Sequence, residues 1–256
     1  MENKLLLNSA KTQAIIMGTS RFINAIDLTN VPAVKVNGTI LQYSTSVRYL
    51  GVTIMNTMSW EMQVTIMANK IHSVLYQLKL CKNLLPESLR AKLVVALAMP
   101  HVDYCCTAYT DMTSEQNLKL HRAVNSCIRY IYSVRRDEHI TPFYERLGWL
   151  RIDARRNYFV GCLLFSILQT QQPSLLRANY SLKVPLSDRT TRAPRDTLLQ
   201  PHCRTELFKR SFRVTSIRMW NDLPSSIKEA KTLAELETDY MRIYSVVLNN
   251  MSLLHL

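Results

Sequence analysis

Cysteine and histidine side chains cluster in one stretch of the sequence, where they could bind a metal ion. Cys105 and Cys106 are adjacent, and His101, His121 and Cys127 are near them in the sequence. Zinc sites use spacings such as Cys-x2-Cys, which is absent here, and adjacent residues of a helix point about 100° apart. We therefore interpret Cys105 and Cys106 as small apolar side chains of the core, and we expect no metal site in this chain.

Complete catalytic sets of other kinds are absent from the sequence. The six histidines occur without a nucleophile signature such as Gly-x-Ser-x-Gly. No two aspartates are adjacent, although such a pair commonly binds the metal ions of a polymerase. The five glycines are too dispersed for a phosphate-binding loop or a dinucleotide fingerprint.

Basic side chains are the remaining chemical feature. The chain has 32 Lys and Arg against 19 Asp and Glu, a formal net charge of +13. Residues 119–218 contain 19 of the basic and 7 of the acidic residues, so nearly the whole excess lies in the middle of the chain. This concentration of charge indicates a binding surface for a polyanionic partner, either nucleic acid or an anionic membrane surface. It is less typical of an ordinary solvated surface.

The elements that would position these residues begin with a β-region. Residues 1–58 are predicted to be extended, with strands at 13–17 and 47–54. Residues 33–41 contain two short strands around Asn37-Gly38, a dipeptide that suits the two positive-φ positions of a type I′ hairpin turn.

From Trp60 the apolar period changes from 2 to 3.6, which predicts helices. The first helix presents one apolar stripe, formed by Val64, Met67, Ile71, Val74, Leu75 and Leu78. Pro86 suits the first turn of a second helix, which presents Leu89, Leu93 and Leu97 on one face and ends at Pro100.

A third helix is predicted from a cap at Thr113 or Ser114 to about Val134. At 100° per residue, one arc holds Leu120, Val124, Cys127, Ile128 and Ile131. Nearly the opposite arc holds Lys119, Arg122, Arg129 and Arg136, along an edge roughly 25 Å long. This edge could follow successive phosphates of a nucleic acid, or it could be a solvated outer face, and the sequence leaves both interpretations open.

The C-terminal half is predicted to be helical around a basic loop. A fourth helix begins at Asp153 and buries Phe159, Leu163, Leu164, Ile167 and Leu168 before Pro173. The loop 173–205 contains at most one short strand and carries Arg177, Lys183, Arg189, Arg192, Arg195 and Arg204. Helices follow at 208–220 and 233–247, separated by Asp222-Leu-Pro224. The fold class is therefore α+β and predominantly α-helical: a small antiparallel β-region, a helical bundle and a helical C-terminal region.

Five short segments add a further signal through their order along the chain. They are Leu7-Asn-Ser-Ala-Lys11-Thr12-Gln13; Val47-Arg-Tyr49-Leu50-Gly51-Val52 followed by Trp60; Pro100-His-Val-Asp-Tyr104; Leu147-Gly-Trp149-Leu150-x-Ile152-x-x-Arg155-Arg156; and Phe212 with Trp220-Asn221-Asp222-Leu223-Pro224-x-x-Ile227. In type and order they resemble segments of the reverse transcriptases, or RNA-directed DNA polymerases, of non-LTR retrotransposons, and in particular of jockey-like LINE elements. The resemblance covers nearly the whole chain.

The resemblance implies a division into three segments. Residues 1–58 would be the end of the palm with the primer-grip hairpin, 59–137 a thumb-like three-helix bundle, and 138–256 a C-terminal helical extension that includes the basic loop 173–205. Lys11 would occupy the motif D lysine position, and Tyr49, Leu50 and Gly51 would belong to the primer grip. The contacts to nucleic acid would come from Lys119, Arg122, Arg129, Arg136, Arg189, Arg192 and Arg195.

The family's catalytic carboxylates, which bind Mg²⁺, lie in a Phe/Tyr-x-Asp-Asp turn upstream of motif D, and this sequence does not contain that turn. We therefore expect a polymerase fragment that does not polymerise alone. It would bind RNA or RNA–DNA hybrid without sequence preference and would associate with the upstream palm and fingers of the same polyprotein.

Two other classes remain open. The chain could be a non-enzymatic helical interaction protein whose basic surface contacts acidic proteins or membranes, or a non-functional transposon remnant with exposed strand edges. The longest apolar runs have 7 residues, against about 20 in a transmembrane helix, and the N-terminus does not resemble a signal peptide. With six cysteines read as reduced thiols, we expect an intracellular protein, nuclear or cytoplasmic, and no membrane partner.

Overall fold

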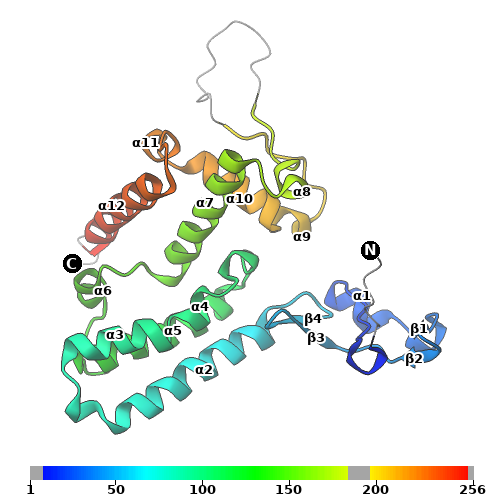
Figure 1. Cartoon of the computed structure of the whole chain (residues 1–256), viewed down its shortest axis with the longest axis horizontal. Helices are drawn as coiled ribbons and strands as arrows, with labels where there is room; N and C mark the ends of the chain where they lie inside the picture. The colour runs from blue at the N-terminus through cyan, green and yellow to red at the C-terminus, as the bar shows by residue number, and fades with distance from the viewer. Residues whose placement is uncertain (1–7, 184–196, 253–256) are drawn as a thin grey trace, which may run out of the picture. The chain divides into compact units, whose positions relative to one another are not determined.

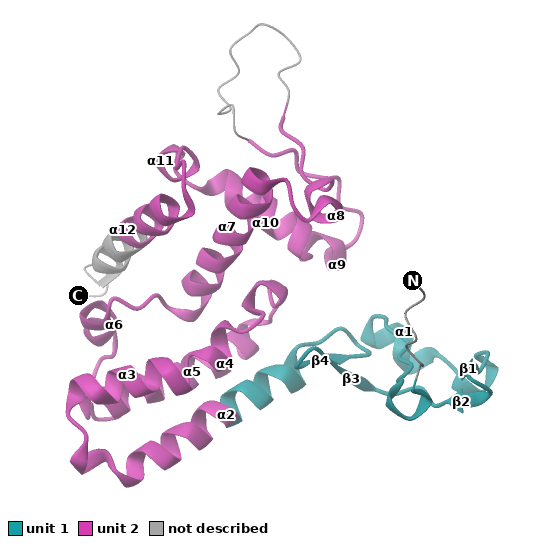
Figure 2. Cartoon of the chain, in the orientation of Figure 1, with its two compact units in different colours: residues 1–69 teal, residues 70–256 magenta. Residues whose placement is uncertain are grey.

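The computed structural model of the chain describes residues 8–183 and 197–252, with side chains up to residue 243 in the last helix. The described part is mostly helical, with two small antiparallel two-stranded sheets near the N-terminus (Figure 1). This confirms the predicted fold class. The chain divides into two compact units, residues 1–69 and 70–256, with the boundary inside helix α2 (Glu61–Leu80) (Figure 2). The division into segments at 58 and 137 stays a prediction.

The first unit consists of short elements joined by turns. They are the 3₁₀ turns Ser9–Lys11 and Leu28–Asn30, helix α1 (Ser20–Ala25), and strands β1 (Val34–Val36), β2 (Thr39–Leu41), β3 (Ser46–Tyr49) and β4 (Val52–Met55). Asn8, Thr19 and Asp27 start the three helical turns, because each side chain accepts a hydrogen bond from a backbone N–H two or three residues later. The strand predicted at 13–17 is wrong, since among the described residues this segment makes one isolated bridge, from Ala14 to Tyr43.

The first hairpin has the predicted turn. Strands β1 and β2 pair antiparallel, with Val36 opposite Thr39. Asn37 and Gly38 connect them with φ values of 49° and 77°. Two consecutive residues with positive φ give the backbone twist that a two-residue hairpin needs, which confirms the prediction.

The second hairpin corrects a prediction, because residues 47–54 are not one strand. Tyr49 pairs with Val52, and the chain reverses between β3 and β4 at Leu50 and Gly51, whose φ values are 47° and 83°. Gly51 can adopt this left-handed conformation without steric cost, so a single glycine reverses a run that otherwise reads as a continuous strand. The backbone N–H of Thr53 then donates to Oε1 of Gln63 at 2.9 Å, which ties β4 to helix α2.

The second unit is helical throughout its described part. Beyond α2 its elements are the 3₁₀ turns Lys82–Leu84 and Cys106–Ala108 and the helices α3 (Glu87–Leu97), α4 (Pro100–Asp103), α5 (Ser114–Tyr132), α6 (Thr141–Leu147), α7 (Ile152–Thr170), α8 (Ser174–Arg177), α9 (Glu206–Lys209), α10 (Phe212–Asp222), α11 (Ser225–Lys228) and α12 (Leu233–Ser252). The helix predicted at 208–220 is instead two helices, because Ser211 is extended and separates α9 from α10. The predicted stops at Pro100 and at Asp222-Leu-Pro224 are confirmed.

Helices α2 and α3 differ in how well their packed faces were predicted. The predicted stripe of α2 is buried from Val64 to Leu78, with Val74 half-buried. On α3, Leu89 and Leu97 are exposed, whereas Val94 and Ala98 are fully buried. Helix α3 therefore packs through the neighbouring row of side chains, which also contains Arg90, and leaves its leucine row largely outside.

The main core of the second unit lies around α7. Helices α10 and α12 pack against α7, and α11 packs against α12 (Figure 1). This core comprises Leu150, Leu164, Phe165, Ile167, Tyr180, Leu198, Ile217, Trp220, Leu223, Ile227, Ala230, Leu236 and Tyr240. Of the residues predicted to be buried on α7, Leu164 and Ile167 are in this core, and the others are half-buried.

The two ends of the predicted loop 173–205 also enter this core. Tyr180 and Leu198 are at most 2% exposed. Leu182 and Leu198 form an isolated antiparallel bridge, in place of the predicted short strand. Asn221 holds this bridge to α10, because its Oδ1 accepts from the Leu198 N–H at 2.8 Å and its Nδ2 donates to the Leu198 carbonyl at 2.9 Å.

Candidate nucleic-acid interface

Helix α5 carries the basic edge predicted from the sequence. It starts at a capping box, in which Thr113 Oγ1 accepts from the Gln116 N–H at 3.2 Å and Gln116 Oε1 accepts from the Thr113 N–H at 3.0 Å. The five residues of the predicted apolar arc, Leu120, Val124, Cys127, Ile128 and Ile131, are all at most 1% exposed. Helix α3 and helix α7 pack against α5. The rotation of α5 is therefore fixed by its apolar face, and the opposite face lies toward solvent.

Lys119 and Arg122 lie on that outer face, and both side chains are exposed. The Arg122 guanidinium donates no hydrogen bond to any residue that the structure describes. Arg129 lies seven residues further along nearly the same direction, about 10 Å from Arg122 along the helix axis. The edge from Lys119 to Arg129 is about 15 Å long, which matches about four nucleotide steps of one duplex strand.

The C-terminal end of α5 corrects the predicted length of this edge. Ser133 has a φ of 57° and ends the helix, so Arg136 lies beyond it and is not on the helical face. The half-buried Arg129 side chain donates to the carbonyl of Arg135 and, at 3.0 Å, to that of Glu138. Arg129 therefore holds the segment that follows the helix, and only part of its charge is offered to solvent. Arg136 itself is exposed.

Other arginines of the basic region form hydrogen bonds or ion pairs with protein groups. Arg155 forms a bidentate ion pair with Asp103, with Nε–Oδ1 at 2.5 Å and Nη2–Oδ2 at 2.7 Å. Arg156 is buried and donates to Oδ1 of Asn117 at 2.9 Å. Arg146 pairs with Glu87 at 2.8 Å. The basic excess of residues 119–218 is therefore partly a set of internal links between helices.

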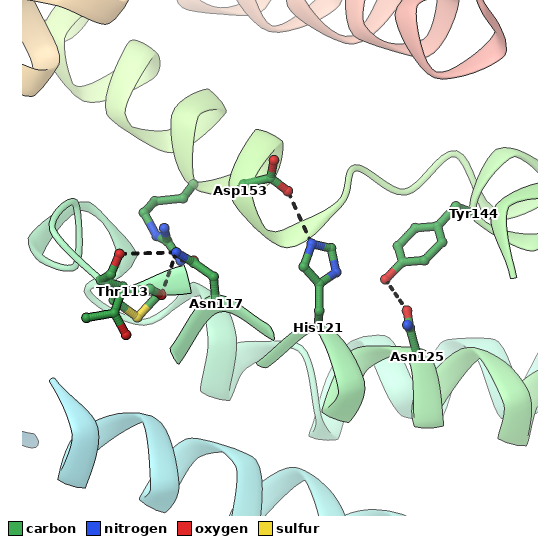
Figure 3. A network of polar contacts seen from close by, with 8 residues as sticks. Thr113, Asn117, His121, Asn125, Tyr144 and Asp153 are labelled. Atoms are coloured by element: carbon green, nitrogen blue, oxygen red, sulfur yellow. Dashed lines mark hydrogen bonds and ion pairs between the residues drawn. The ribbon is translucent and has the colours of Figure 1, made fainter. Parts of the chain in front are cut away.

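A row of polar side chains on α5, which the sequence prediction missed, faces the segments before and at the start of α7 (Figure 3). Asn117, His121 and Asn125 follow one another at intervals of four residues. His121 Nε2 lies 3.3 Å from Oδ1 of Asp153, and Asn125 Oδ1 accepts from the Tyr144 hydroxyl at 2.8 Å. The spacing of four along a helix was the signal that could have revealed this row.

Asp153 anchors the middle of this row. The hydrogen bond from His121 lowers the pKa of the Asp153 carboxyl to about 2, against the opposing effect of its partial burial. The carboxyl is thus ionised at neutral pH and accepts the hydrogen from Nε2 of His121. The row joins α5 to α7 and to α6 through polar contacts.

The residues assigned to the primer grip lie together at the tip of the β3–β4 hairpin, in the first unit. Tyr49 and Leu50 are 65% and 73% exposed, and Gly51 is exposed as well. Leu50 adopts a left-handed conformation that is costly for a side chain with a Cβ, and such backbone strain concentrates at functional positions. Lys11 ends the 3₁₀ turn Ser9–Lys11 and is exposed.

The remaining predicted contacts are in the loop 173–205. Arg189, Arg192 and Arg195 lie outside the described residues. The described flanks of this loop show that Lys183 and Arg204 are exposed, whereas Arg177 donates to the Tyr180 carbonyl and to Oε1 of Gln171.

The cysteines are consistent with apolar packing. Cys106 and Cys127 are buried, and burial raises the pKa of each thiol to about 12, which leaves both protonated and unreactive at neutral pH. Cys105 is half-buried in a left-handed turn, not in a helix. Over residues 8–183 and 197–252, no three His, Cys, Asp or Glu side chains are grouped as a metal site requires. The described residues therefore do not fit a bound Mg²⁺ or Zn²⁺.

No helix in the described part of the chain is both long enough and apolar enough to cross a membrane. Comparison of the chain with models of known protein families, with curated proteins and with solved structures finds no match. A function has to be inferred from the residues of the chain itself.

Proposed function

We propose that the chain is a part of a non-LTR, jockey-like reverse transcriptase that binds RNA or RNA–DNA hybrid through the sugar-phosphate backbone. The exposed edge of α5, with Lys119 and Arg122, is the observation that carries this proposal. This edge lies on the side of α5 opposite to its fully buried apolar face. The packing of that face therefore fixes the direction in which the basic side chains point. A basic edge on a rigid helix can contact successive phosphates, and such contacts give affinity without sequence preference.

The hairpin tip supports the same function from the first unit. Tyr49 offers an exposed aromatic ring at a fixed turn, and aromatic side chains bind nucleic acids by stacking on bases. Leu50 and Gly51 would bring the backbone close to a primer strand. Lys11 would serve as the lysine of motif D.

This chain alone would not catalyse DNA synthesis. Two-metal catalysis requires carboxylates that hold Mg²⁺, and neither an Asp-Asp pair in the sequence nor a group of acidic ligands among the described residues provides them. We expect no extension of a DNA primer on an RNA template in the presence of Mg²⁺. Extension above a control without protein would contradict this part of the proposal.

The binding proposal is tested with the double variant Arg122→Gln, Arg136→Gln. Both arginines are exposed and donate no hydrogen bond to any described residue, so the fold should tolerate the change. Fluorescence anisotropy with a labelled RNA–DNA hybrid is measured from 50 to 200 mM salt. Each lost phosphate contact reduces the slope of log affinity against log salt by about 0.9, so we expect the slope to fall by about 2.

The matched control is the double variant Arg21→Gln, Arg218→Gln. These arginines are also exposed and lie on α1 and α10, so the net charge changes by the same amount elsewhere on the chain. We expect it to reduce affinity much less. Equal effects of the two double variants would reject the assignment to α5 and the segment that follows it, and absence of binding at 50 mM salt would reject the function.

A second candidate function, a helical interaction protein, is favoured by exposed apolar side chains at the end of α2. Tyr76 and Leu80 lie one turn apart on α2 and are 69% and 76% exposed, and Leu84, in the 3₁₀ turn that follows, is 84% exposed. Exposed apolar side chains of this kind are typical of a surface that contacts another protein. If the hybrid does not bind, a change in oligomeric state on substituting Leu80 and Leu84 by Gln would support this candidate.

A further inference from the structure

A small cavity lies beside the polar row of α5, in the second unit. Its volume is about 190 Å³, and its lining residues come from α5, from the segment before α6 and its first residues, and from the residue before α7. They are His121, Asn125, His139, Ile140, Thr141, Tyr144 and Arg151. Six of these seven side chains carry a polar group, and none is a carboxylate.

The polar groups around this cavity are mainly donors. Oδ1 of Asn125 is already occupied by the Tyr144 hydroxyl at 2.8 Å, so the Nδ2 amide group, which donates, is the part of Asn125 left for a ligand. Among the described residues, Nδ2 of Asn125, the His139 ring and the Arg151 guanidinium have no hydrogen-bond partner. Thr141 adds a hydroxyl, which can donate.

His121 also borders the cavity, through its second ring nitrogen. Its Nε2 is directed at the ionised Asp153, and the other ring nitrogen, Nδ1, is on the side of Tyr144 and Asn125 (Figure 3). Because Nε2 donates its hydrogen to Asp153, Nδ1 of the neutral ring is an acceptor and can bind a protonated oxygen of a phosphate. Asp153 is not a lining residue, but its carboxylate attracts the Arg151 guanidinium as well as His121, so a phosphate has to compete with it for part of the Arg151 charge.

A cation does not fit this arrangement. The permanent charge of Arg151 repels a metal ion, and no third His, Cys, Asp or Glu joins the two histidines as a ligand in the described part of the chain. An anion with several acceptor oxygens is complementary to it. Arginine, amide and imidazole donors are the groups that commonly bind phosphate.

The size of the cavity limits the ligand further. At about 190 Å³ it is smaller than the pockets that bind drug-sized molecules, which have about 300–1,000 Å³. A tetrahedral oxyanion with residual water fits this space.

We propose that this cavity is a phosphate site, in which Arg151, His139 and the Asn125 amide bind the oxygens of one phosphate group. The phosphate could be free, or it could be the terminal phosphate of a nucleic-acid strand, and the second source rests on the proposed function. The site itself does not depend on it, because inorganic phosphate is a sufficient ligand.

The test is an NMR titration of the whole chain with inorganic phosphate, followed through the imidazole signals of His121 and His139. We expect saturable shifts of both signals. Arg151→Gln should weaken phosphate binding by roughly tenfold or more, because it removes a charged donor. Asn125→Asp should abolish binding, since it replaces the donor amide by a carboxylate, while its oxygen still accepts from Tyr144 and preserves the fold.

Arg218→Gln is the matched control, because it removes the same charge from an exposed position on α10 that does not line the cavity. It should leave phosphate binding unchanged. The proposal is overturned if phosphate causes no saturable shift, if the control weakens binding as much as Arg151→Gln, or if Zn²⁺ shifts the signals and phosphate does not.

The source of the phosphate is identified by competition. A short oligonucleotide with a 5′-phosphate should displace inorganic phosphate if strand ends are the ligand, and the same oligonucleotide without that phosphate should not. If neither displaces it, the site holds free phosphate. The hybrid-binding assay with Arg122→Gln, Arg136→Gln is independent of this titration, so failure of one proposal is recognised without the other.

Discussion

Residues 8–69 and residues 70–252 bury their apolar side chains in different ways. The first unit contains two separate short hairpins, and its buried apolar residues are few among those described: Leu41, Val52, Val64, Met67 and Ala68, three of them on α2. The second unit has a continuous core between α7, α10, α11 and α12, and a second buried face along α5. Two-stranded sheets are marginally stable in water on their own. The helical unit should therefore carry most of the stability of the chain.

The expected difference in stability between the two units is tested most strongly by truncating one core side chain in each. Ile128 is fully buried on α5, and Ile128→Ala should lower the free energy of unfolding by about 3–4 kcal/mol, through lost burial and the cavity that remains. Leu41→Ala in the first unit should cost about half as much, since its neighbours can collapse around the gap. Urea unfolding followed by circular dichroism measures both. Equal costs would show that the first unit is as tightly packed as the second.

The second unit also depends on polar links between distant segments, above all Asp103–Arg155. Both side chains are 25% exposed, so Asp103→Asn leaves a partly desolvated guanidinium without its charge partner and should cost about 2 kcal/mol. The control is Asp137→Asn in the pair with Arg135, whose nitrogen and oxygen are 3.7 Å apart with side chains 80% and 76% exposed. That change should cost less than about 0.5 kcal/mol. A comparable loss in both variants would contradict the structural role of Asp103.

Substituting one glycine in each unit compares how the two units tolerate the same backbone strain. Gly38 in the β1–β2 turn and Gly148 at the end of α6 have φ values of 77° and 63°, and nothing lies within 4 Å of a Cβ added at either. Alanine at each position should therefore cost about 1 kcal/mol through backbone strain alone.

The consequences of this equal strain should differ. Gly38→Ala should disrupt the first hairpin locally, seen as loss of the cross-strand NMR contacts between Val36 and Thr39. Gly148→Ala should only lower the melting temperature of the second unit by a few degrees. Retention of the hairpin contacts in Gly38→Ala would mean that the first unit is more stable than its small core indicates.

The smallest expected effect is the pH dependence contributed by Asp153. Its pKa in the folded chain is about 2, below the ordinary 3.8, so its stabilising contribution is complete above about pH 4 and is lost as the pH falls through about 2. Because the side chain is 66% exposed, this contribution should be at most about 1 kcal/mol. Urea unfolding at pH 5 and at pH 2.5 measures it. Asp153→Asn should remove this part of the pH dependence, and an unchanged profile would contradict the assignment.

Local rules predicted the long helices and one hairpin. Thr113 marks the start of α5, Asn37-Gly38 marks the first turn, and the five apolar residues of α5 identify its buried face, because each of these depends on nearby residues only. The residue pattern missed the turn inside 47–54 and the break at Ser211, although the family resemblance implied a primer-grip hairpin in this region. Residues 47–54 and 208–220 have the pattern of one strand and one helix, and the break in each depends on the conformation of one or two residues.

The candidate site was predictable in type but not in detail. That α5 has a basic outer face follows from its sequence. That Arg129 binds the carbonyls of Arg135 and Glu138 does not, since it depends on where the chain turns after Ser133. The contacts of His121 and Asn125 were missed because their partners, Asp153 and Tyr144, are far away in the sequence, and only the fold brings them together.

Helix α2 begins in one unit and ends in the other, and no loop interrupts it at the boundary between Asn69 and Lys70. The amide groups of residues 70–73 bind the carbonyls of residues 66–69, so the first turn assigned to the second unit is hydrogen-bonded to the last turn of the first. In hydrogen–deuterium exchange, the protection factors along α2 should therefore rise gradually over one or two turns and not in a single step. Local opening of α2 would then start at its N-terminal turn, next to the hairpins, and become rarer toward its C-terminal end.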